Sequence, residues 1–348
     1  MSMDDHRPGA VYWIDHYVVP TNDLPKHMDF MRNVLGAKVP ERMMWLTTRH
    51  RMRNAPLPVF CEVGHYHHNG GFLQNRMLPE MKPLGQGVPR YGYYVRRADM
   101  DEHLKRLDEN QCPHTDPIAV SHEGQEGTTI YFADYDGNQY EFWAPRYMPP
   151  GAMEADNPVR IGRISHVVLE SRDLNHTHDF YNEFCALDVI ENGDIEKNTM
   201  VFQMEAGGRM IFKLVDELSD RTGTHNKWTG QHAALCVRDD EFISSYRHMW
   251  ERVPESSHRR FQEEVPDESN MPPRTELHGL VALREREATF MRGTSFYDWD
   301  TNCYHFVGGR PLDGSMAHYA MGFDDTNVPE EAYANLPAYS GPDLRVKE

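Results

Sequence analysis

Two stretches of the chain combine an apolar, strand-like run with an apolar pattern of helical period. WIDHYVVPTNDLPKHMDFMRNVLG at 13–36 aligns without gaps with RISHVVLESRDLNHTHDFYNEFCA at 163–186, at a constant offset of 150 residues. Each stretch begins with a β-branched run, and an Asp-Leu step then predicts the start of a helix. Later apolar runs, such as those at 199–205 and 208–217, predict strands. The predicted unit is a strand, a helix and then several strands.

A second unit follows inside each half of the chain. The segment 89–107 corresponds to 231–249, and these units end in GNQYEFWAP at 137–145 and TNCYHFVGG at 301–309. Internal repeats of this kind define the architecture of a chain. We therefore predict an α+β fold of four βαβββ modules paired as two domains. The first domain covers 10–147 and the second covers 161–310. Between them lies a linker at 148–160, rich in proline and small or acidic residues, and a C-terminal extension follows at 311–348.

Composition limits the classes of partner. The chain has 348 residues and a formal net charge of −18, from 36 Lys and Arg against 54 Asp and Glu. Nucleic acids and anionic membranes attract concentrated positive charge, so we expect neither as a partner. No apolar run approaches the roughly 20 residues that span a bilayer, and no secretory signal is apparent, which predicts a cytoplasmic protein. The five cysteines have no CxxC spacing, so neither a disulfide framework nor a zinc–cysteine site is indicated.

The modular pattern resembles a known superfamily. Four βαβββ modules with a histidine on the first strand of a module resemble the vicinal oxygen chelate superfamily, and the two-domain size resembles the type I extradiol ring-cleavage dioxygenases. The resemblance covers residues 10–310. It implies two tandem domains with curved, mostly antiparallel sheets and a metal in the second domain. The metal ligands would be one histidine on the first strand of module three, one on the first strand of module four, and a glutamate on the last strand of module four.

These ligand positions correspond to His166, His232 and His305, so the third position departs from the carboxylate of the family. Each histidine alone could be an ordinary core residue, whereas three imidazoles at three ligand positions predict a metal site. Neutral imidazoles leave a divalent ion its full charge, which would attract an anionic chelating substrate. Imidazole suits several transition metals alike. Iron(II) is expected because of the resemblance, with Mn, Co, Ni or Zn as alternatives.

The equivalent positions of the first half are His16, Arg90 and Glu141. Arginine keeps its proton and has no lone pair, so it cannot be a metal ligand. Its guanidinium could instead replace the positive charge of the ion. We predict a structural Arg90–Glu141 contact and no metal in this half.

The resemblance also implies residues that bind the substrate or move protons. Tyr297 lies eight residues before His305 and matches the tyrosine of the family, although it could equally be a core aromatic residue. His278 lies 19 residues before Tyr297, which exceeds the family's spacing. His225 precedes module four and could reach the mouth of the pocket or lie in a solvated loop.

A rival metal motif is VGHYHHNGG at 63–71, in which His65 and His67 could share one face of a strand. The Asn-Gly-Gly step favours a hairpin turn, and exposed turn histidines are the preferred interpretation.

Three functional classes remain open at the level of the sequence. The leading hypothesis is a metal-dependent extradiol-type dioxygenase that cleaves a small catechol-like aromatic substrate with O₂. The second is an oxygen-independent lyase, isomerase or hydrolase of the glyoxalase type, since the carboxylate ligand is missing. The third is a metal-free ligand-binding relative. The resemblance also implies a homo-oligomer.

Overall fold

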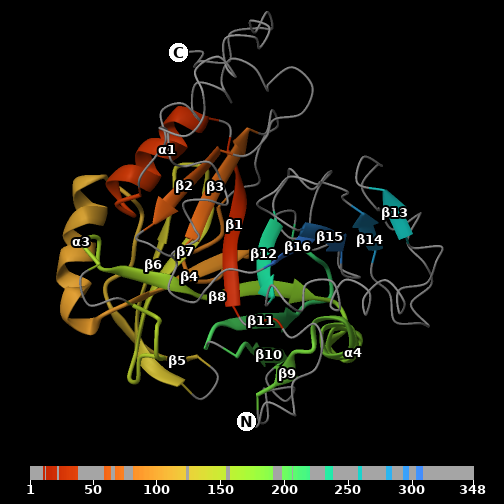
Figure 1. Ribbon diagram of the computed structural model, residues 1–348. Helices are drawn as coiled ribbons and strands as arrows, with labels where there is room; N and C mark the ends of the chain where they lie inside the picture. Colours follow the sequence, from red (N-terminus) through yellow and green to blue (C-terminus); the bar gives the residue numbers. More distant parts are fainter. Residues whose placement is uncertain are drawn as a thin grey trace, which may run out of the picture.

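The structure is a computed structural model (Figure 1) that describes residues 11, 13–21, 23–37, 59–63, 67–73, 81–122, 125–153, 157–190, 198–205, 207–219, 232–237, 258–260, 280–283, 293–297 and 303–308. For β2, β3, β13 to β16 and His232, this description covers the backbone alone. The first half contains β1 (Trp13–Thr21), α1 (Leu24–Asn33), β2 (Val59–Val63), β3 (His67–Leu73), β4 (Arg90–Val95), the 3₁₀ helix η3 (Arg97–Asp99), α3 (Met100–Glu109), β5 (Ile118–His122), β6 (Gln125–Ala133) and β7 (Gln139–Pro145). The second half contains β8 (Ile161–Ser171), α4 (Leu174–Cys185), β9 (Asp188–Val189), β10 (Thr199–Gln203), β11 (Arg209–Leu214), β12 (His232–Val237), β13 (His258–Arg260), β14 (Leu280–Leu283), β15 (Gly293–Tyr297) and β16 (Cys303–Gly308).

The two aligned stretches fold in the same way at their helix starts. The side chain of Asp23 accepts a hydrogen bond from the backbone N–H of Lys26 at 3.0 Å, and Asp173 accepts one from His176 at 3.1 Å. An aspartate at this position satisfies one of the backbone N–H groups that the first turn leaves without a helical partner. The repeated Asp-Leu step is therefore a pair of N-caps, as the sequence indicates.

The strands form two sheets, which we call the first and second sheets. The first sheet has the order β13-β14-β15-β16-β12-β1-β3-β2, and the second has the order β5-β6-β7-β4-β8-β11-β10-β9. Most neighbouring strands in the two sheets are antiparallel, and the parallel pairs are β1–β3, β4–β7, β8–β11, β12–β16 and β13–β14. The mixed α+β class with mostly antiparallel sheets is confirmed.

The sequence predicted that modules next to one another in each half of the chain pair into a domain, but the sheets pair the modules in another way. β4 pairs with β8 in the second sheet, and β1 pairs with β12 in the first sheet. In Figure 1, β1 and β12 lie side by side near the centre, and β8 runs across them. Each sheet thus combines strands from both halves of the chain. Residues 148–160, predicted as a linker between domains, connect β7 and β8 of a single sheet.

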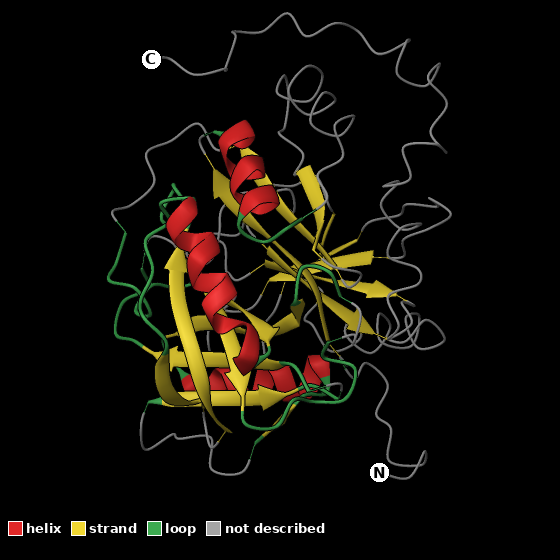
Figure 2. Cartoon of the chain, turned by 90° about the vertical axis from the view of Figure 1, so that its left-hand side faces the viewer, coloured by secondary structure: helices red, strands yellow, loops and turns green. Residues whose placement is uncertain are grey.

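The core lies between the sheets and the helices. Figure 2 looks at the side on which α1 and α3 lie in Figure 1, with the strands behind these helices. Tyr17 of the first sheet stacks on Tyr91 of the second, with ring centroids 3.9 Å apart, and its hydroxyl contacts that of Tyr93. These rings bury area from both sheets in one cluster, which ties β1 to β4.

The proposed hairpin turn at Asn-Gly-Gly is not present. Residues 69–71 lie inside β3, which pairs with β1 on one side and with β2 on the other. His67 is the first residue of that strand, and His65 lies outside the described residues. In the part of the chain that the structure describes, no helix is long and apolar enough to span a membrane.

Candidate metal centre

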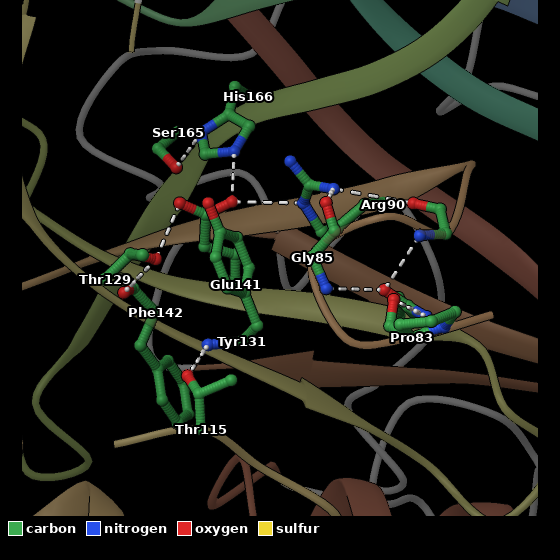
Figure 3. Close-up of polar contacts among 12 residues, drawn as sticks. Pro83, Gly85, Arg90, Thr115, Thr129, Tyr131, Glu141, Phe142, Ser165 and His166 are labelled. Carbon is green, nitrogen blue, oxygen red and sulfur yellow. Dashed lines mark hydrogen bonds and ion pairs between the residues drawn. The ribbon is translucent and has the colours of Figure 1, made fainter. Parts of the chain in front are cut away.

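A row of facing residues crosses the second sheet. Glu141 of β7 lies opposite Gly92 of β4, and Gly92 lies opposite His166 of β8 on its other side. His166 Nε2 lies 3.1 Å from Glu141 Oε2, across the intervening glycine. Figure 3 shows the carboxylate of Glu141 between the ring of His166 and the guanidinium of Arg90. The sheet therefore brings together side chains from three strands.

Both oxygens of the Glu141 carboxylate accept hydrogen bonds from the protein. Its Oε2 accepts hydrogen bonds from Arg90 Nε and His166 Nε2, each at 3.1 Å, and its Oε1 accepts one from Thr129 Oγ1 at 2.6 Å. The predicted Arg90–Glu141 contact is confirmed. Its histidine neighbour is His166 and not His16. Because the guanidinium cannot donate electrons to a metal, this cluster does not fit a metal ion.

The segment before β4 holds Arg90 in this position. Arg90 Nη1 donates to the carbonyl of Gly85 at 2.6 Å, while the backbone N–H groups of Gly85 and Gly87 donate to Gln139 Oε1 at 3.0 and 3.1 Å. The guanidinium also lies 4.9 Å from the centre of the Tyr131 ring. Burial, together with the nearby Glu141 carboxylate, raises the pKa of Tyr131 to about 12, against an opposing effect of Arg90. Arg90 is thus fixed by the loop, the ring and the carboxylate together.

Gly92 makes room for the ring of His166. A Cβ atom on Gly92 would lie 2.2 Å from Cε1 of His166, which is closer than any non-bonded contact. The pairing register shifts between Gly92 and Tyr93, so that Ser165 has no facing residue on β4. Ser165 Oγ lies 2.9 Å from His166 Nδ1. Both nitrogens of this ring therefore have protein partners.

The first sheet contains the same row with other residues. His305 of β16 lies opposite Ala234 of β12, and Ala234 lies opposite His16 of β1. His232 lies opposite Val18, two residues along β1 from His16, just as Arg90 lies opposite Val168 in the second sheet. By register, His16 corresponds to His166, His232 to Arg90 and His305 to Glu141.

The structure separates the three predicted ligands. It places the backbones of His232 and His305 on neighbouring strands of the first sheet, and it places His166 in the second sheet beside Glu141. The side chains of His232, His305 and Tyr297 lie outside the described part, as do His278 and His225 altogether. Among the side chains that are described, no group of three His, Cys, Asp or Glu residues could hold a metal.

His16 is the residue that completes the row with His232 and His305. It is buried, and its Nδ1 lies 2.6 Å from Asp15 Oδ2. The alignment of 13–36 with 163–186 marks His16 and His166 as equivalent. It does not tell which of them lies beside β12, because that depends on which strands pair.

Comparisons with known proteins give the same class of fold. Residues 13–142 match the family model described as Glyoxalase/Bleomycin resistance protein/Dioxygenase superfamily. A presumed dioxygenase from Bacillus subtilis has a similar structure, with a TM-score of 0.64 and 15% identity, over 94% of this chain and 96% of that one. Glyoxalase I from Zea mays is also similar, with a TM-score of 0.54 and 13% identity, over 89% of this chain and 96% of that one. A search of curated protein sequences gave no match.

The resemblance to the vicinal oxygen chelate superfamily is thus supported by the family model over residues 13–142, and the similar solved structures show the same fold over most of the chain. Since one fold carries several chemistries, the reaction has to be argued from the residues of the site.

Proposed function

We propose that the row in the first sheet is the metal site of an enzyme, with His16, His232 and His305 as ligands. The observation that supports this is the register: the three histidines occupy the positions that Arg90, His166 and Glu141 hold in the second sheet. There, Arg90 and His166 both contact the carboxylate of Glu141. Imidazole is a good donor for divalent transition metals, and strands fix donor directions well. The donor set therefore fits a metal, whereas that of the second sheet does not.

A three-histidine site has consequences for the substrate. Neutral imidazoles do not reduce the charge of a divalent ion, so an anionic substrate with two adjacent oxygens is favoured as the chelating partner. When bound, the ion would supply Lewis-acid chemistry and, for a redox-active metal, a path for electrons to O₂. The protein residues would hold the ion on one side and leave the other side to the substrate.

As the reaction, we propose extradiol-type cleavage of a catechol-like aromatic compound with O₂ and iron(II). The similarity to the presumed dioxygenase over nearly the whole chain supports this choice. Tyr297, the last residue of β15, remains a candidate for substrate binding, and His278 and His225 remain candidates for proton transfer. A cytoplasmic homo-oligomer remains a prediction.

One observation favours a second candidate. The position that holds Glu141 in the second sheet holds His305 in the first, so no carboxylate completes the row. An oxygen-independent reaction of the glyoxalase type, which needs only charge stabilisation by the ion, would tolerate such a donor set. The similarity to glyoxalase I from Zea mays is in line with this alternative.

Elemental analysis of protein purified without a histidine tag tests the site. We expect one divalent ion per chain, lost in His16→Ala, His232→Ala and His305→Ala. His166→Ala is the matched control, because it removes the equivalent histidine from the second sheet and should leave the metal content unchanged. Loss of metal in His166→Ala but not in His16→Ala would contradict the assignment. A wild-type protein without metal after anaerobic loading would favour the metal-free ligand-binding alternative.

Oxygen uptake separates the two reactions. After anaerobic loading with iron(II), a dioxygenase should consume O₂ and form a yellow ring-opened product with members of a catechol panel. A loaded protein that takes up no O₂ with any catechol would leave the glyoxalase-type reaction as the better proposal. Retention of nickel, cobalt or zinc in place of iron would point the same way.

A further inference from the structure

We propose that Asp15 is a positioning residue that orients His16 as a metal ligand, an inference that rests on the metal site proposed above. Asp15 Oδ2 lies 2.6 Å from His16 Nδ1, and both side chains are 0% exposed. A carboxylate only accepts hydrogen bonds, so the proton of the neutral ring lies on Nδ1. The lone pair is then on Nε2, the nitrogen that would face the ion. Metal-ligating histidines commonly donate their second N–H to a carboxylate in this way.

A β-bulge makes the contact possible. Consecutive side chains of a regular strand point to opposite faces, which would separate Asp15 from His16. The register between β1 and β12 shifts between Ile14 and His16, so Asp15 faces no residue of β12. Bulges of this kind redirect a side chain and are frequent beside functional sites. The local backbone therefore brings the carboxylate to the ring.

The second sheet offers an internal comparison. Ser165 occupies the corresponding bulge in β8, and its hydroxyl lies 2.9 Å from Nδ1 of His166. In the second sheet, a neutral hydroxyl thus contacts His166, which donates to Glu141. In the first sheet, the row of His16, His232 and His305 contains no carboxylate, and the carboxylate of Asp15 contacts His16. A site of three neutral imidazoles has no negative charge of its own, and Asp15 would supply one directly behind a ligand.

Ala234 adds a steric reason for a separate orienting group. A Cβ on Gly92 would lie 2.2 Å from the ring of His166, and Ala234 carries that methyl group at the equivalent position of the first sheet. The ring of His16 therefore cannot take the orientation that the ring of His166 has. Asp15 holds the orientation that His16 adopts instead.

Titration of the full-length, metal-free protein with Co²⁺ tests this role, because the visible absorption of bound cobalt reports ligand geometry. Asp15→Ser is the main variant, since the bulge of β8 accepts serine at the corresponding position. We expect it to bind Co²⁺ about 10–100-fold more weakly than the wild type and to change the spectrum. Asp15→Asn keeps an acceptor oxygen for Nδ1–H and should lose less affinity. Ser165→Ala is the control and should bind as the wild type does.

A second readout does not need metal. Nitrogen-15 chemical shifts of histidine in the metal-free protein should show the Nδ1–H tautomer for His16 in the wild type and a mixture of tautomers in Asp15→Ser. Binding by Asp15→Ser within about two-fold of the wild type, with an unchanged spectrum, would overturn the role of Asp15 while leaving the metal site intact. Wild-type binding that persists in His232→Ala and His305→Ala would instead refute the site itself, and the role of Asp15 with it. If Asp15→Ser does not fold, the affinity and spectrum of Asp15→Asn decide, and wild-type values there would refute the proposal.

Discussion

Removal of the guanidinium from the second sheet should destabilise the fold strongly. Arg90 and Glu141 form an ion pair at 3.1 Å with side chains that are 3% and 0% exposed. Arg90→Met keeps much of the side-chain volume but leaves a buried carboxylate without its cation. Breaking a buried pair on one side typically costs about 3–5 kcal/mol, because the remaining charge is desolvated and uncompensated. Thr129 and His166 still donate to Glu141, so we expect the lower end of that range.

Arg146 provides a matched control. It pairs with Glu126 at 3.2 Å, but these side chains are 64% and 72% exposed. Exposed pairs are worth about 0–1 kcal/mol, so Arg146→Met should be nearly neutral. Urea denaturation followed by circular dichroism measures both variants. With a urea dependence of about 3 kcal/mol per molar, the midpoint of Arg90→Met should fall by about 1 M.

A double variant tests the cause of the loss. Arg90→Met combined with Glu141→Gln removes the unpaired charge while keeping oxygen and nitrogen atoms for hydrogen bonds. It should recover at least about 1 kcal/mol relative to Arg90→Met alone. Equal midpoints for the Arg90→Met and Arg146→Met variants, or a double variant no more stable than the single one, would refute the reasoning from burial.

Three further outcomes are expected from the described contacts. Gly92→Ala should cost about 1–3 kcal/mol of unfolding free energy in urea denaturation, since its methyl group would overlap the ring of His166; an unchanged midpoint would contradict this. Arg90→His should create a second site of two histidines and Glu141, measured as an additional divalent ion per chain, and an unchanged metal content would count against the equivalence of the two rows. Burial and the nearby Arg106 cation lower the pKa of His103 to about 3, below its ordinary value of about 6.5. Between about pH 3 and pH 6.5 the unfolded chain binds more protons than the folded chain. The contribution of His103 to the free energy of unfolding is therefore complete above about pH 6.5 and decreases as the pH falls toward 3, by about 2 kcal/mol at pH 5. Urea midpoints at several pH values should show this loss in the wild type but not in His103→Phe, and parallel profiles would argue against it.

The modules and the equivalence of their positions could be predicted from local patterns. β-branched runs and helical spacing of apolar residues mark β1 and α1, and again β8 and α4. The Asp-Leu steps became N-caps at Asp23 and Asp173 because a short acceptor side chain satisfies backbone N–H groups only a few residues away. The contact between Arg90 and Glu141 was also predictable, since Arg90 lies on the strand that begins a module and Glu141 on the strand that ends the same module.

The grouping of the candidate ligands depended on contacts that local patterns do not encode. The sequence by itself determined that His16 is equivalent to His166, Arg90 to His232 and Glu141 to His305. Only the tertiary structure decided that β1 lies beside β12 and β8 beside β4. Strand edges pair through backbone groups that are the same in every strand, so the choice of partner is made by packing across the whole molecule. For that reason His166 lies with Arg90 and Glu141, and His16, not His166, lies on the strand beside that of His232.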